Sequence, residues 1–139
     1  MASLIYNNAI WWQVKGAIDF DTDTFKAMLV TSSYTPDKDT HDFRNDVTNE
    51  VSGTGYTAGG TAATVTVAAI DTTNDRIEVT LGAVSWLTST ITARGAVYYK
   101  SRGGASSADE LVAYIDFGSD ISSSGGTFAL SSSLLRFQN

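Results

Sequence analysis

The chain has 139 residues, no cysteine, one histidine and a formal net charge of −6. At this length roughly two thirds of the unfolded surface is buried in a single domain, so folding needs no metal or disulfide. The excess of Asp and Glu over Lys and Arg argues against nucleic acid and anionic membrane as partners, and the lack of cysteine excludes disulfides and thiolate sites.

Neither a membrane span nor a targeting segment is visible in the sequence. No run approaches the ~20 apolar residues of a spanning helix. Residues 1–16 lack the cationic start, the unbroken apolar run and the small-residue cleavage site of a signal peptide. We therefore expect the chain to be made in a cytoplasm.

Two segments have helical character. In residues 4–16, apolar side chains recur at helical spacing, and Gly16 is a plausible C-terminal stop. Residues 39–51 offer capping candidates at Asp39 and Thr40, but they are too polar for more than a turn or two.

The rest of the chain reads as short strands separated by turn residues. Residues 76–81 alternate, with Ile77 on one face and Glu78 on the other, which predicts a sheet with one wet face. Residues 71–75 form the preceding hairpin loop. The further strands are expected at residues 25–32, 64–70, 83–87, 91–101, 110–118, 127–131 and 134–137, with turns at 102–109 and 118–126.

About seven or eight strands and one short helix near the N-terminus predict a mainly β fold. The leading architecture is an antiparallel β-sandwich or jelly roll. We expect one domain over residues 1–139, with a long glycine-rich loop at about residues 46–61.

The acids Asp19, Asp21 and Asp23 alternate like the start of a calcium loop. Thr24 replaces the required glycine, and Val30 replaces the bidentate glutamate. We interpret the segment as an acidic turn, with incidental cation binding left open.

His41 is the only histidine, and it lies in a polar segment that we expect to be solvated. No G-x-S-x-G elbow supplies a nucleophile for it to activate. No pair of carboxylates is singled out for glycoside hydrolysis. We expect no enzyme activity and no cofactor.

The glycine-rich stretch "DVTNEVSGTGYTAGG", residues 46–60, raises the question of a phosphate loop. No Lys or Arg occurs in residues 45–70, and a strand rather than a helix follows. We instead interpret it as a docking loop. Tyr56 would be its aromatic contact, with Asp46 and Glu50 as acids beside it.

Adjacent aromatic pairs suggest surface buried against other chains. On a helix, Trp11 and Trp12 point about 100° apart, so one packs inward and the other meets a neighbour. On a strand, Tyr98 and Tyr99 point to opposite faces, which predicts one core and one outward side chain.

The stretch "GAIDFDTDTFKAMLVTSSYTPDKDTHDFRNDVTNEVSGTGYTAGG", residues 16–60, resembles a recurrent block in small structural proteins of tailed bacteriophages. "DTTNDRIEV", "TARGAVYYK" and "LVAYIDFGSD" extend the resemblance to about residue 121. The family that this resemblance implies is that of the virion decoration, or cement, proteins. The two ends of the chain, with "IWWQVKG" and "SSSLLRFQN", match less clearly. We expect the contacts that are specific to this chain's own phage particle to lie there.

The resemblance implies a non-enzymatic β-rich domain on the outside of an icosahedral head. Its expected partners are the major capsid protein and itself, as a dimer or trimer. Its expected location is the capsid exterior, after synthesis in a host bacterial cytoplasm. The alternatives are a tail, connector or head-fibre attachment protein, and a carbohydrate-binding sandwich that uses Trp11 or Tyr98 as a stacking platform.

Overall fold

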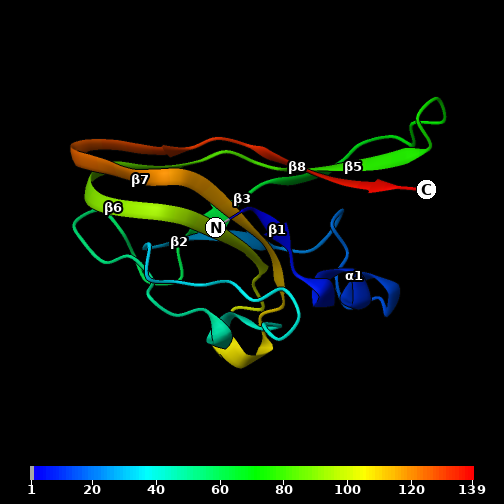
Figure 1. Cartoon of the computed structure of the whole chain (residues 1–139), viewed down its shortest axis with the longest axis horizontal. Helices are drawn as coiled ribbons and strands as arrows, with labels where there is room; N and C mark the ends of the chain where they lie inside the picture. The colour runs from blue at the N-terminus through cyan, green and yellow to red at the C-terminus, as the bar shows by residue number, and fades with distance from the viewer. Residues whose placement is uncertain (1) are drawn as a thin grey trace.

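The computed structural model describes residues 2–139 (Figure 1). It contains the strands β1 (Leu4–Ile5), β2 (Phe25–Val30), β3 (Thr61–Ala63), β4 (Val65–Val67), β5 (Arg76–Leu81), β6 (Val84–Lys100), β7 (Leu111–Leu130) and β8 (Ser133–Gln138), the helix α1 (Asn7–Val14), and the 3₁₀ turns η1 (Arg44–Asp46) and η2 (Ser106–Ala108). One antiparallel sheet has the order β1-β7-β6-β2-β3, and the other has the order β4-β5-β8. The predicted mainly β class with a short N-terminal helix is confirmed.

A long two-stranded ribbon links the two sheets. β5 continues into β6 after two residues, and β7 continues into β8 after two residues. In Figure 1 the ribbon runs from β6 and β7 on the left to β5 and β8 on the right. Gly82 lies where it changes sheet, and a Cβ there would be 2.4 Å from the Thr64 carbonyl oxygen. Only glycine fits this corner.

The predicted turn at residues 118–126 is wrong, because this segment lies within β7. It pairs with β6 through bulges, at which the register shifts between Ala93 and Gly95. Gly118 and Gly125 adopt positive φ there. Serine and glycine suit a bulge as well as a turn, and pairing with the distant β6 decides between them.

The helical segment begins later than its apolar spacing predicts. Leu4 and Ile5 form β1 instead, because they pair with Tyr114 and Ala113 of β7. The stop at Gly16 is confirmed: with φ 75°, its N–H donates to the Gln13 carbonyl. This bond is part of a Schellman motif.

The capping roles predicted for Asp39 and Thr40 are wrong. Their backbone N–H groups instead donate to the Asp37 carboxylate in a turn. The helical part of this region is the single turn η1, which the Asp46 carboxylate caps. The segment is otherwise irregular.

The main core lies between the two sheets and combines Leu29 and Tyr98 of the large sheet with Leu81 and Leu135 of the small one. A second cluster lies on the other face of the large sheet and includes Tyr6, Met28, Tyr34, Val97, Tyr99 and Tyr114. The prediction that Tyr98 or Tyr99 points to solvent is therefore wrong, since both are buried. The face that carries Tyr99 is covered by the connection between β2 and β3.

Candidate interaction surface

The glycine-rich loop is fastened to the chain's own β2. The Glu50 carboxylate accepts hydrogen bonds from the Tyr56 hydroxyl at 2.7 Å and from the Gly59 N–H at 2.6 Å. The Tyr56 hydroxyl in turn accepts from the Leu29 N–H at 2.9 Å. Burial raises the pKa of the Tyr56 phenol well above its usual value, and the Glu50 carboxylate raises it further. Tyr56 thus links loop and sheet.

The expected docking role of Tyr56 and Glu50 is corrected by these contacts. The glycines of the loop do allow close backbone approach, but the surface they approach belongs to the same chain. At Gly60, a Cβ would lie 1.9 Å from the Ala27 carbonyl oxygen. The Tyr56 ring lies 5.9 Å from Trp86, at the edge of the main core.

Asp46, the third residue predicted in the docking loop, also has an internal role. Burial alone would raise the pKa of Asp46. The N–H groups of Asp42 and Phe43 donate to its carboxylate at 2.9 and 3.2 Å, and they lower that pKa below its usual value. Asp46 therefore orders the start of η1.

The alternating acids form a turn that is tied to β6. Asp19 accepts from the Asp21 N–H, and Asp23 accepts from the Asp19 N–H. Lys100 bridges to Asp23 at 2.9 Å. Within residues 2–139, no group of three or more His, Asp or Glu side chains is arranged to hold a metal ion.

His41 is half-buried rather than solvated, which corrects the sequence expectation. Its Nδ1 lies 2.9 Å from the Tyr34 hydroxyl, and the two rings stack at 5.7 Å. The Tyr34 hydroxyl also lies 2.8 Å from that of Tyr6. Burial raises the pKa of Tyr34 to about 12, so the Tyr34 phenol keeps its proton at neutral pH.

The two tryptophans divide between core and surface as their helical spacing predicts, although their ring centroids are 4.6 Å apart. Trp12 packs against the main core and lies 5.5 Å from the Phe43 ring. Trp11 is 49% exposed, with the Lys15 ammonium 4.8 Å from its ring. Ile10 and Val14 are exposed beside it, Val14 at 82%. Val14 follows Trp11 by three residues and Ile10 by four, so it lies between them on one exposed side of α1.

A groove opens between the end of α1 and the inner face of the small sheet. Its volume is about 550 Å³, and its lining includes Gln13, Val67, Ile77 and Phe137. In Figure 1, α1 lies beneath the β5–β8 end of the ribbon, where the small sheet extends beyond the large one. Parts of the inner face are therefore left uncovered.

Exposed apolar side chains concentrate at this end of the molecule. Nine large apolar side chains are exposed among the described residues, and six of them belong to α1 or to the β4–β5 hairpin. We call this group the apolar end: Ile10, Trp11, Val14, Val67, Ile70 and Ile77. Exposed apolar side chains that gather in one region often mark an interaction surface.

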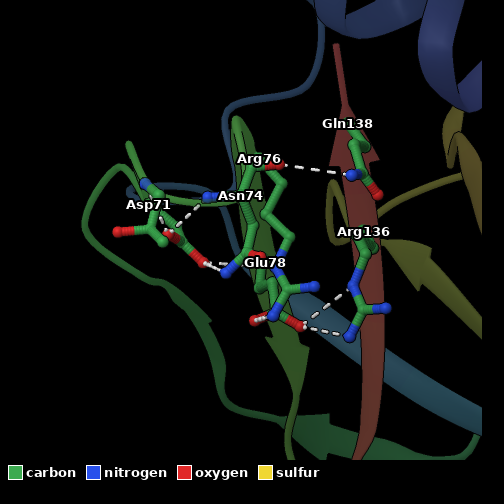
Figure 2. Close-up of polar contacts among 7 residues, drawn as sticks. Asp71, Asn74, Arg76, Glu78, Arg136 and Gln138 are labelled. Atoms are coloured by element: carbon green, nitrogen blue, oxygen red, sulfur yellow. Dashed lines mark hydrogen bonds and ion pairs between the residues drawn. The ribbon is translucent and has the colours of Figure 1, made fainter.

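The outer face of the same small sheet is polar. Figure 2 shows Glu78 of β5 beside Arg136 of β8, with the two side chains 3.0 Å apart. Arg76 lies 3.3 Å from Asp71 and 3.5 Å from Glu78. The alternation in residues 76–81 predicted this wet face, and the opposite face carries the groove.

Sequence reasoning identified Trp11 at this surface but missed Val67, Ile70 and Phe137. Their signal was present as apolar residues in the strands of the small sheet and in the loop that follows β4. The sequence did not reveal that the large sheet, which packs against the small one, ends before it reaches these residues. No helix within residues 2–139 is long and apolar enough to traverse a bilayer.

Comparison with protein-family models, curated proteins and solved structures finds no match to this chain. The exposed surfaces of the chain and the sequence resemblance are therefore the evidence that bears on its function.

Proposed function

We propose that this chain is a non-enzymatic decoration protein that binds the outside of a bacteriophage head and joins neighbouring major capsid protein subunits. The apolar end is the proposed contact surface. The observation that carries this proposal is the asymmetry of the small sheet: its apolar inner face is partly uncovered, whereas its outer face carries an ion-pair network.

The exposed residues suit burial against another protein. Trp11 combines a large apolar ring with few rotatable bonds, which is typical of residues that dominate interface energies. Val14 and Ile70 are 82% and 71% exposed, so they contribute little to the isolated fold. Removing this surface from water on the capsid would stabilise the complex by about 25 cal/mol per Å² of apolar area.

Many weak contacts would give strong cohesion on a shell. Each copy that contacts two capsid subunits links them, and the repeated lattice multiplies a modest affinity. A chain that binds only the assembled shell stabilises it by linkage. No reaction chemistry is needed: His41 lies against Tyr34, and the Asp19 and Asp23 carboxylates accept hydrogen bonds within the chain.

The sequence resemblance over residues 16–121 supports the virion assignment, and two other roles stay as alternatives. A tail, connector or head-fibre attachment protein would be present in about six to twelve copies per particle, whereas a decoration protein reaches hundreds. A carbohydrate-binding role loses Tyr98 as a stacking platform, because that side chain is buried, and keeps only Trp11.

Quantifying the protein in purified virions tests the proposal. A stained gel calibrated against the major capsid protein should give hundreds of copies per particle. Six to twelve copies would favour the tail or connector, and binding to a glycan array would favour the carbohydrate role. Either result would overturn the proposal.

A further inference from the structure

β8 is an uncovered edge of the small sheet. It pairs with β5 alone, and the ladder between them runs from Arg76 and Gln138 to Leu81 and Ser133 without a register shift. A six-residue strand with one free side is a template for another strand.

The main-chain groups that face the free side can be identified. The Ala68 N–H donates to the Glu78 carbonyl, so the main chain of Glu78 faces β4 and that of its neighbour Val79 faces β8. At the end of the ladder, the Asn139 N–H donates to the Asp75 carbonyl. In the odd-numbered residues of β8, the main-chain N–H and C=O groups therefore point to β5. Even-numbered residues, including Leu134, point N–H and C=O groups outward.

The other sheet edges are shorter or irregular. β1 has two residues, and β3 and β4 have three each. The free part of β7 is broken by bulges opposite Ser89 and Ala93. Bulges and short edges hinder pairing with another chain. Among the described strands, β8 alone offers a regular edge of this length.

The side chains of β8 do not shield its edge. Arg136 reaches back across the sheet to Glu78, and Gln138 donates to the Asn74 carbonyl at 3.2 Å (Figure 2). Leu134 is 58% exposed on this otherwise polar face. A small groove of about 230 Å³ runs beside the edge, lined in part by Ile5 and Leu135.

We propose that two copies of this chain form a two-fold dimer by antiparallel pairing of their β8 strands. The two-fold axis places side chains of the inner face of one β8 opposite side chains of the inner face of the other. In each possible register, therefore, one residue of β8 lies opposite the same residue of the second copy and forms the centre of the pairing. A register centred on Leu135 places Leu134 opposite Arg136 of the second copy, and Ser133 opposite Phe137. A register centred on Arg136 would oppose two guanidinium groups.

The register centred on Leu135 gives the exposed side chains of both copies favourable neighbours. Leu134 gains the aliphatic stem of Arg136 as a neighbour, while that guanidinium stays with Glu78. Inner side chains of the added strand lie toward the apolar groove beside Ile5. The inference is independent of the virion proposal, because it depends only on the edge; it names the surface for the self-association that the resemblance implies.

Light scattering during size-exclusion chromatography of the purified chain tests the dimer. At about 100 µM we expect the mass of two 14.8 kDa chains. Leu134→Pro removes an outward N–H and leaves the β5 ladder intact, so it should halve the mass. Leu134→Lys places a cation opposite Arg136 and should act likewise, which covers the case in which the proline variant fails to fold.

Leu87→Lys is the matched control, since Leu87 is equally apolar, 69% exposed and distant from β8 in the ladder. It should stay dimeric. A monomeric native chain, a trimer, or a dimer that survives both Leu134 substitutions would overturn the proposal.

Cysteine cross-linking tests the register, because the native chain has no cysteine. The double substitution Leu134→Cys with Arg136→Cys places thiols on directly opposed residues, within reach of a disulfide. Under mild oxidation it should give a covalent dimer. Leu134→Cys alone should cross-link at least tenfold more slowly. Equal rates would overturn the Leu135 register.

Discussion

The Tyr56 hydroxyl donates to Glu50 at 2.7 Å while it accepts from the Leu29 N–H, so one phenol joins the glycine-rich loop to β2, an interior strand of the large sheet. This arrangement assigns the loop to the fold of the chain itself. The surfaces left for partners are then the apolar end and the edge of β8.

Removing the Tyr56 hydroxyl should destabilise the fold. Tyr56→Phe leaves the Glu50 carboxylate without one donor and the Leu29 N–H without its acceptor, at a cost of about 1–3 kcal/mol. Tyr56→Ala also loses the contact with Trp86 and should cost about 3 kcal/mol or more. Urea unfolding measures both. Thr57→Ala, at an exposed neighbouring position, should change stability by less than about 0.5 kcal/mol. A Tyr56→Phe variant as stable as the native chain would refute the anchoring role.

Two glycines with matching backbone angles should respond differently to alanine. Gly60 and Gly103 have φ of 75° and 77°, but a Cβ at Gly60 meets the Ala27 carbonyl oxygen, whereas Gly103 faces open space. Gly103→Ala should cost about 1–2 kcal/mol, the penalty of the left-handed region alone. Gly60→Ala should cost at least twice as much. Equal losses in thermal unfolding would mean that the loop does not lie against β2.

Acid should weaken the fold through Asp46. Its folded pKa is lowered by the N–H groups of Asp42 and Phe43, which outweigh the opposing effect of burial. The unfolded chain therefore binds the proton more tightly, and the stabilisation present above the unfolded pKa is lost as the pH falls through the folded one. Urea unfolding from pH 7 to pH 3 should show falling stability.

Asp46→Asn should reduce that pH dependence. Asp42, whose pKa is raised by burial and by Asp46, acts in the opposite sense, so Asp42→Asn should steepen the loss. Profiles that do not change in either variant would mean that this carboxyl pair is not responsible.

Substitution at the apolar end should leave the isolated fold intact. Val14→Lys places a cation in the last turn of α1, where the helix dipole favours it. Trp11→Ala loses the Lys15 contact and the ring contact with Trp12 at 4.6 Å, but the Trp11 side chain is already 49% exposed. Each should change the free energy of unfolding by less than about 1 kcal/mol. Larger losses would mean that these side chains belong to the core.

The sequence predicted what local patterning controls. The strand at residues 76–81, the hairpin before it and the stop at Gly16 follow from alternation and turn chemistry, and the structure contains all three. The division between Trp11 and Trp12 follows in the same way from helical geometry.

Long-range packing decided the rest. Tyr99 is buried because a distant connection covers its face, and its hydroxyl donates to the Gly59 carbonyl. The segment at residues 118–126 is strand because β6 extends far enough to pair with it. Tyr56 turns inward because Glu50 and Leu29 meet it there. In each case the residue that determines the outcome is either far away in the sequence or positioned by the tertiary fold, which local sequence patterns do not specify.

The central claim is that the apolar end binds the phage head, and co-sedimentation with cognate heads lacking this protein tests it most directly. The native chain should pellet with the heads, Val14→Lys should bind at least tenfold more weakly, and Leu87→Lys should bind like the native chain. Native and Val14→Lys chains that pellet equally, or a native chain that stays in the supernatant, would contradict the claim.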